Sequence, residues 1–129
     1  EYYLQRYAND LPGHIHEGIR DEIMVTLNDP DFADIFGATA RAEVPISGHM
    51  KDGRLMSGQI DRLLITHDEI LIVDYKTNRP PPHDPKNIPA VYRGQMQAYA
   101  EILSQIYPNR VIKAALLWTD GARLMPVDV

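Results

Sequence analysis

Hydrophobic positions change their spacing along the chain, and the change marks a different kind of structure. Between residues 15 and 27, apolar residues recur at every fourth position among acidic ones, which is typical of an amphipathic helix. From Arg41 onward the spacing becomes two, which predicts extended strands. We therefore expect residues 1–36 to form a helical lead-in and residues 37–129 to form the core of the same domain.

The core should contain a three-stranded antiparallel meander followed by a helix and further strands. Asp52-Gly53 is a strong signal for a two-residue hairpin turn, and His67-Asp68 separates the second strand from the third. Five prolines within residues 77–89 exclude regular helix or central strand there. The predicted elements are a strand from Arg41, strands over 55–66 and 69–76, a helix over 90–107, a strand over 111–118 and an edge strand over 123–127.

The order of these elements, α-β-β-β-α-β, predicts an α/β fold. Residues 111–118 form an apolar run of strand length that joins the sheet through the preceding helix. We expect a central mixed sheet flanked by helices. Met96 on the helix and Trp118 at the end of the apolar run should belong to the core.

Composition and charge narrow the class of protein. The chain has 129 residues, no cysteine and a net charge of −5. Without cysteine, a disulfide scaffold, an iron–sulfur cluster and a thiolate zinc site are excluded. No apolar run approaches the roughly 18–20 residues that span a bilayer, so we expect a cytoplasmic protein without membrane contact. Negative charge argues against a simple electrostatic binder of nucleic acid, but the first 36 residues hold eight acidic and two basic residues, so the acidity lies in the lead-in.

Two aspartates and a lysine form the candidate chemistry of the predicted sheet. Asp74 and Lys76 lie two positions apart on the third strand and therefore project from one face. If residues 67–68 form a two-residue loop, Asp61 faces Asp74 across the second and third strands, where like charges destabilise the sheet. Lys76 supplies one positive charge, and a divalent cation would complete the compensation. A register slip of one residue would instead turn Asp61 to the opposite face.

Oxygen-only ligation by two carboxylates suits Mg²⁺ or Mn²⁺. Such a cation supports phosphodiester hydrolysis, because it stabilises charge on phosphorus-bound oxygens and lowers the pKa of an attacking water. Lys76 would orient or activate that water, or balance the charge on phosphorus. From spacing alone, the alternative is a sheet surface on which the two aspartates and the lysine form an ordinary ion-paired cluster.

Three segments, in this order, resemble successive motifs of a known enzyme family. Residues 58–63 read Gly-Gln-Ile-Asp-Arg-Leu, residues 72–78 read Ile-Val-Asp-Tyr-Lys-Thr-Asn, and residues 95–99 read Gln-Met-Gln-Ala-Tyr. Together they resemble the motifs of the PD-(D/E)XK nuclease superfamily, and most closely the RecB-type nuclease domain at the C-terminal end of the AddA helicase–nuclease subunit. Residues 114–120 and 123–125 are also similar to the AddA branch.

The resemblance implies a restriction-endonuclease-like core and gives roles to individual residues. Asp61 and Asp74 would be catalytic ligands of Mg²⁺, with Mn²⁺ as a substitute, and the Tyr75 main-chain carbonyl would be a third ligand. Lys76 would be catalytic, and two helix residues would support the site and the DNA strand. Those residues are Gln95 and Tyr99, for which the alternative is a polar pair that covers the sheet.

Two features of RecB-type proteins are not matched by this sequence. RecB-type nucleases carry a further metal-binding His on a helix upstream of the first strand, and neither His14 nor His16 matches its sequence context. We therefore expect the corresponding His on a helix that precedes Glu1. No Gly-x-x-x-x-Gly-Lys loop is present, so no ATP site is expected within these residues. We therefore expect the chain to be a fragment of a larger helicase–nuclease, and its partners to be the helicase portion of the same polypeptide and an AddB-type subunit.

Other charged and aromatic residues flank the predicted site. Glu43 lies on the first strand, and a two-residue turn at residues 52–53 would place it opposite Arg62, which favours a salt bridge over a role in the site. The candidates for contact with DNA are Arg79, Lys86 and Arg93 for phosphates, and Tyr92 or Tyr99 for base stacking, with a solvated loop as the alternative.

The sequence as a whole predicts a Mg²⁺-dependent deoxyribonuclease domain. By the resemblance, it acts as an exonuclease on single strands that an attached helicase unwinds during double-strand break repair, and it contacts the DNA backbone. The alternative from another class is a non-catalytic, nuclease-like module that binds DNA or partner subunits. A third interpretation is a structural domain whose charged face is only ion-paired.

Overall fold

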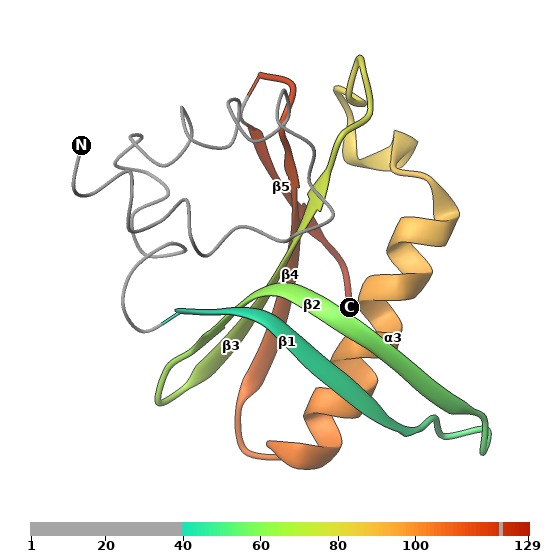
Figure 1. The fold of residues 1–129 in the computed structure, drawn as a ribbon, viewed down its shortest axis with the longest axis vertical. Helices are drawn as coiled ribbons and strands as arrows, with labels where there is room; N and C mark the ends of the chain where they lie inside the picture. The colour runs from blue at the N-terminus through green and yellow to red at the C-terminus, as the bar shows by residue number, and fades with distance from the viewer. Residues whose placement is uncertain (1–39, 122) are drawn as a thin grey trace.

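The computed structural model describes residues 40–121 and 123–129. They form a five-stranded mixed sheet, in the order β1-β2-β3-β4-β5, with one long helix packed against a face of it (Figure 1). The predicted α/β fold is confirmed for this part of the chain, and the predicted lead-in over residues 1–36 lies outside the described residues. The elements are β1 (Ala40–His49), β2 (Leu55–Ile65), β3 (Glu69–Lys76), the short 3₁₀ helix η2 (Pro85–Asn87), α3 (Ala90–Ile106), β4 (Val111–Trp118) and β5 (Arg123–Val127).

Helix α3 connects β3 to β4, and these two strands are parallel. Their pairing runs from Glu69 and Val111 at one end to Lys76 and Trp118 at the other. Both strands are buried on both faces over most of their length, as is usual for parallel strands in the middle of a sheet. The remaining pairs are antiparallel, so the predicted mixed sheet is confirmed.

A five-residue connection closes the β1–β2 hairpin, so the predicted two-residue turn is wrong. His49 and Leu55 are the last facing pair, and Met50 donates its N–H to the Arg54 carbonyl at 2.8 Å. Gly53 has φ 88°, a conformation that glycine adopts without steric cost. The register therefore differs by one residue from the predicted one.

This register changes the partners at the other end of the hairpin. Ala42 faces Arg62, where Glu43 was expected, and Val44 faces Ile60. Glu43 therefore lies opposite Asp61 and not opposite Arg62. The expectation that Glu43 lies away from Asp61 is wrong, because it depended on the two-residue turn.

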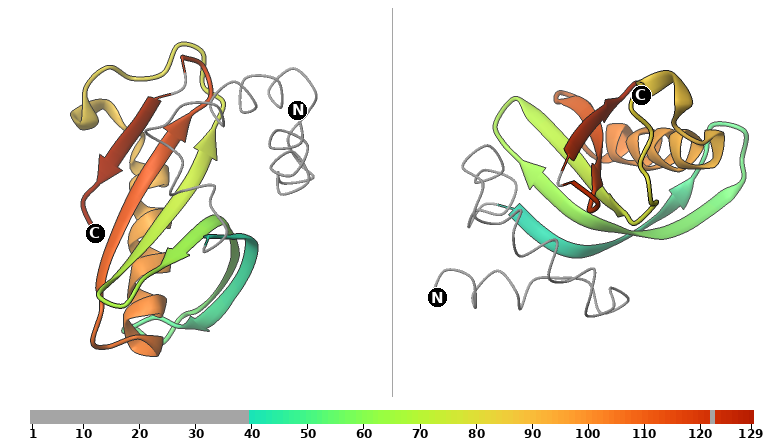
Figure 2. Two further views of the ribbon diagram at one scale, coloured as in Figure 1. Left: turned by 90° about the vertical axis from the view of Figure 1, so that its left-hand side faces the viewer. Right: turned by 90° about the horizontal axis from the view of Figure 1, so that it is seen from above.

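Side chains along β2 alternate between the two faces of the sheet, and this alternation is interrupted at Asp61. Ile60 and Leu63 are three positions apart, and a regular strand would turn them to opposite faces, yet both belong to the core cluster beneath α3. Glu43, opposite Asp61 on β1, has φ 50°, which side-chain-bearing residues rarely adopt. This kink lets β1 and the first half of β2 curve over α3 (Figure 2), and it leaves Asp61 at the bend.

The core lies between α3 and the sheet. Met96 and Trp118 are fully buried in it, which confirms the prediction for both residues. Helix α3 follows Pro89, and Tyr107 ends it by donating its N–H to the Leu103 carbonyl at 2.8 Å. Within the described part of the chain, no helix is both long enough and apolar enough to cross a membrane.

Candidate metal-binding active site

The β2–β3 register brings the two predicted aspartates together. Thr66 donates its N–H to the Glu69 carbonyl at 2.9 Å, which closes the predicted two-residue loop. The ladder then runs to the facing pair of Arg62 and Val73, and the next position in the same register places Asp61 opposite Asp74. Both aspartates are only 5% exposed.

Asp61 also bonds to the backbone of β3 at the point where β2 leaves it. Its Oδ2 accepts a hydrogen bond from the Tyr75 N–H at 2.8 Å. The N–H and C=O of one residue in a strand point to the same neighbouring strand. The Tyr75 carbonyl is therefore directed to the side of β3 on which Asp61 lies, where a third oxygen ligand was expected.

Lys76 connects the aspartates to the helix. Its Nζ lies 2.6 Å from Asp74 Oδ2, which confirms that residues 74 and 76 project from one face, and it donates to Gln95 Oε1 at 3.1 Å. The lysine side chain is 14% exposed and that of Asp74 is 7% exposed. An ion pair is present, but it is buried, which an ordinary surface cluster would not be.

Helix α3 reaches the site through Gln95 and Tyr99, which lie one turn apart on one helix face. Gln95 Nε2 donates to the Tyr99 hydroxyl oxygen at 3.1 Å, and that hydroxyl donates to the Gln59 main-chain carbonyl at 3.2 Å. A continuous polar chain thus runs from Asp74 through Lys76 and the helix to the backbone of β2. The two helix residues therefore connect the helix to the sheet beside the aspartates.

Gly58 allows Tyr99 to approach β2. A Cβ at this position would lie 2.8 Å from the Tyr99 hydroxyl oxygen and 2.9 Å from its Cε1. No real Cβ tolerates such distances, so any larger residue must displace the ring. The glycine of the first sequence motif therefore has a steric reason, three positions before Asp61.

The two carboxylates carry more negative charge than Lys76 alone balances. Burial, and after it the neighbouring Asp74, raise the pKa of Asp61 to about 8, although the Tyr75 N–H and Lys76 act in the opposite direction. Asp61 therefore holds a proton at neutral pH unless another cation replaces it. A divalent ion is the compensation that this chemistry favours.

The residues present fit a hydrated Mg²⁺ or Mn²⁺ ion. A pocket of about 240 Å³ is lined by Asp61, Asp74, Tyr75 and Lys76, with Gln59 and Gln95. Among residues 40–121 and 123–129, no three His, Asp or Glu side chains form a cluster. Mg²⁺ does not need one, since it commonly takes one or two carboxylates, keeps several waters and accepts substrate phosphate oxygens.

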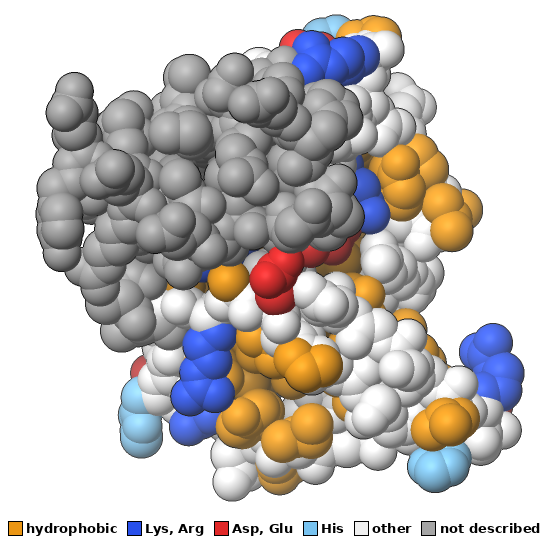
Figure 3. Space-filling model, in the orientation of Figure 1, with side chains coloured by type: hydrophobic (Ala, Val, Ile, Leu, Met, Phe, Trp, Pro, Cys, Tyr) orange, Lys and Arg blue, Asp and Glu red, His pale blue; other side chains and the backbone are white. Residues whose placement is uncertain are grey.

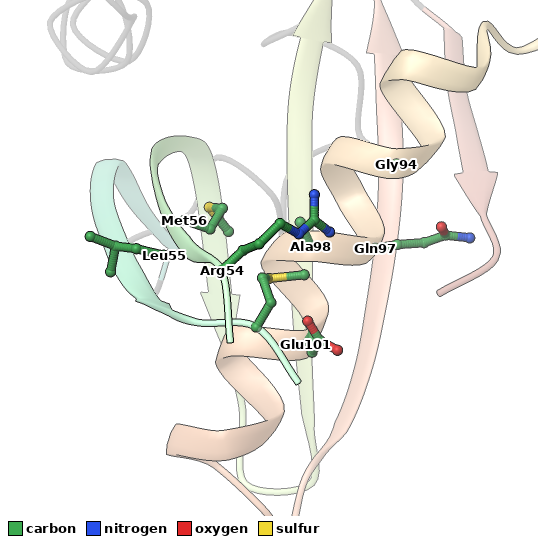
Figure 4. Close-up of a pocket in the computed structure, with 8 residues that line it drawn as sticks. Arg54, Leu55, Met56, Gly94, Gln97, Ala98 and Glu101 are labelled. Atoms are coloured by element: carbon green, nitrogen blue, oxygen red, sulfur yellow. The ribbon is translucent and has the colours of Figure 1, made fainter. Parts of the chain in front are cut away.

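A larger pocket lies away from the carboxylates. It has a volume of about 570 Å³ and lies between the end of the β1–β2 hairpin and the outer side of α3. Figure 4 shows Arg54 extended from the hairpin toward Ala98 on the helix, whereas Gln97 points away. None of the predicted ligands lines this pocket, so we place the chemistry in the smaller one.

The residues predicted to contact DNA differ in their exposure and in their protein partners. Lys86 is exposed, and Arg79 is half exposed with its guanidinium 3.9 Å from Asp120. Arg93 donates to the Pro85 carbonyl at 2.9 Å. Tyr99 is 4% exposed, so the expectation that its ring stacks on a base is wrong. Figure 3 shows acidic side chains gathered near the middle of the face turned to the viewer.

Two residues near Lys76 were not predicted in the roles they occupy. The Lys76 ammonium lies 4.2 Å from the centre of the Tyr92 ring, and the Tyr92 hydroxyl donates to Asn78 Oδ1 at 2.9 Å. Tyr92 is one of the two residues that the sequence offers for base stacking. Its position three residues before Gln95 on one helix face was the signal that could have placed it beside the site.

Comparison with known proteins gives consistent results. A family model described as the PD-(D/E)XK nuclease superfamily matches residues 5–124. The curated relatives include AddA proteins, which are named as parts of an ATP-dependent helicase/nuclease. Those of Streptococcus thermophilus, Lactiplantibacillus plantarum and Anoxybacillus flavithermus are 35%, 32% and 32% identical over 68%, 69% and 67% of this chain. The matched regions cover only 7–8% of the length of these relatives.

Proposed function

Because the chain belongs to the PD-(D/E)XK nuclease superfamily, we propose that it is the nuclease domain of an AddA-type helicase–nuclease and hydrolyses phosphodiester bonds in DNA. The observation that carries this proposal is the buried pair of Asp61 and Asp74, with Lys76 2.6 Å from the second carboxylate. The names of the curated relatives, which include both helicase and nuclease, support the same assignment.

In this proposal Asp61, Asp74 and the Tyr75 carbonyl hold Mg²⁺, or Mn²⁺ in its place. The bound cation would stabilise charge on the phosphorus-bound oxygens and acidify a water. Lys76 would place its ammonium beside the phosphate, where it orients the attacking water or balances the charge that develops. Gln95 accepts a bond from Lys76 and donates to Tyr99, so it fixes the position of the lysine relative to the helix.

The whole protein would act on single strands as an exonuclease during double-strand break repair. The helicase portion of the same polypeptide would deliver those strands, with a partner of the AddB type, in the cytoplasm. Lys86 is an exposed cation of the proline loop, and with Arg79 and Arg93 it would contact DNA phosphates. The names of the relatives include the word helicase, which supports the proposal that unwound DNA reaches the nuclease.

Calorimetric titration with Mn²⁺, followed by cleavage of end-labelled single-stranded DNA, tests the proposal. We expect one site that Asp74→Ala abolishes, together with cleavage that requires the cation. Asp68→Ala is the matched control, because Asp68 is an exposed acidic residue in the β2–β3 loop. Binding that survives Asp74→Ala would contradict the assigned site. Metal binding by this chain, together with no cleavage of any DNA by the full-length protein that contains it, would favour the non-catalytic module.

A further inference from the structure

Lys76 is held by three contacts, and one of them involves a residue outside the three sequence motifs. Asp74 and Gln95 bond to its ammonium, and the third contact is the Tyr92 ring, whose centre lies 4.2 Å from Nζ. We infer that Tyr92 is a positioning residue that holds the Lys76 ammonium in the candidate site through the face of its ring. The inference rests on the proposed function, which gives Lys76 its part in the reaction.

A lysine at this position needs such a contact. Its four-carbon stem is flexible and its three donors rotate, so the ammonium has no fixed place of its own. Asp74 attracts it strongly in the metal-free protein, but a divalent cation would draw on the same carboxylate. The Tyr92 ring attracts a cation through its quadrupole and carries no charge. It therefore keeps Lys76 in place without competing for the metal.

The ring is itself fixed from two directions. The Tyr92 hydroxyl donates to Asn78 Oδ1 at 2.9 Å, and Asn78 lies two residues beyond Lys76 at the start of the loop after β3. The ring centre lies 6.2 Å from that of Trp118, with the planes tilted by 48°. Because Trp118 is fully buried and faces Lys76 in the β3–β4 ladder, the aromatic pair rests on the rigid part of the sheet.

Tyr92 also completes a row along α3. Tyr92, Gln95 and Tyr99 are spaced by three and four positions, so they share one helix face. The first two contact Lys76, and the third contacts the Gln59 carbonyl. This face of α3 therefore sets the distance between the lysine and the strand that carries Asp61.

Proton NMR of the metal-free 129-residue chain tests the contact directly. A proton above an aromatic ring resonates upfield, so the Lys76 Hε protons should be shifted upfield in the wild-type protein. Tyr92→Phe keeps the ring and should retain the shift, whereas Tyr92→Leu should abolish it. Tyr92→Met, which is unbranched and flexible, provides a second ring-free variant if the leucine disturbs folding. Tyr107→Leu is the control, since Tyr107 lies at the far end of α3, beside Arg110.

Cleavage assays with Mn²⁺ separate positioning from a merely structural role. Tyr92→Leu should lower kcat about tenfold, the scale of one partly desolvated cation–π contact, and change KM less than twofold. Tyr107→Leu should leave both unchanged. An Hε shift that survives Tyr92→Leu or Tyr92→Met, or an unchanged kcat, overturns the inference. If the wild-type chain cuts no DNA, the Hε shifts alone decide whether Tyr92 positions Lys76, and Mn²⁺ binding that survives Asp74→Ala is the result that contradicts the proposed function.

Discussion

Asp61 on β2 accepts the main-chain N–H of Tyr75 on β3 at 2.8 Å, so a side chain takes the place of a strand partner where the two strands separate. This bond favours the ionised carboxylate, but burial and the neighbouring Asp74 oppose it more strongly and raise the pKa to about 8. The protonation of one buried group is therefore tied both to the folding of the sheet and to cation binding.

Without divalent cations, the free energy of unfolding should fall as pH rises from about 4 to about 8. Folded Asp61 keeps its proton up to its pKa of about 8, whereas unfolded Asp61 loses it near the ordinary value of 3.8. The folded state binds more protons in this window, so stability decreases with pH. Urea unfolding in EDTA measures this free energy at each pH. It should vary less with pH for Asp61→Asn than for the wild type, because the asparagine does not titrate. Equal slopes for the two proteins would contradict the prediction.

The affinity for Mn²⁺ should increase as pH rises toward 8. Asp61 has to lose its proton before it can ligate a cation, so binding releases a proton. Calorimetry in two buffers with different ionisation enthalpies measures that release. Asp68→Ala should behave as the wild type does, and Asp61→Asn should bind weakly at every pH. Wild-type affinity that does not vary with pH would show that Asp61 is not a ligand.

Gly58→Ala should destabilise the protein by about 1–3 kcal/mol, the usual cost of overpacking a tight contact. The new Cβ would lie 2.8 Å from the Tyr99 hydroxyl oxygen, so the ring must move away from the Gln59 carbonyl. Gly94→Ala is the control, because a Cβ there meets nothing within 4 Å and α3 gains a better helix former. Chemical denaturation of both variants gives the comparison, and equal stability would exclude the steric role of Gly58.

Tyr99→Phe should cost about 1–3 kcal/mol, because the Gln59 carbonyl loses its side-chain donor. Cleavage should also slow, since Gln95 Nε2 loses the hydroxyl that accepts its hydrogen bond. Tyr107→Phe, at the other end of α3, removes a hydroxyl outside the site. Stability and single-turnover cleavage are measured on both. A loss of stability without any loss of cleavage would assign Tyr99 to the fold alone.

Strand positions and the β2–β3 register were predictable from local signals. The polar pair between Thr66 and Glu69 allows only a short loop, and that loop fixes the facing residues up to Asp61 and Asp74. The β1–β2 register was not predictable in the same way. Met50 and Arg54 bond to each other across the turn, so the Asp-Gly signal lies inside a longer connection.

The kink and the lysine contacts could not be predicted, for a different reason. The left-handed conformation of Glu43 leaves no mark in the sequence, because glutamate has no preference for it. Tyr92 carried a helical spacing that points to the site, but its contact with Lys76 depends on where α3 lies on the sheet. Motif order predicted the proposed chemistry, whereas packing decided which neighbours contact the site residues.

The kink at Glu43 and Asp61 has a consequence for protein engineering. On a regular strand, Ile60 and Asp61 would project to opposite faces. One face of the sheet could then not hold both the core residue Ile60 and the candidate ligand Asp61. Grafting the aspartates and the lysine onto an ideal five-stranded scaffold would keep both carboxylates on one face, but it would turn Ile60 and the first half of β2 away from the core. A transplant of this site has to carry the bent hairpin backbone along with the side chains.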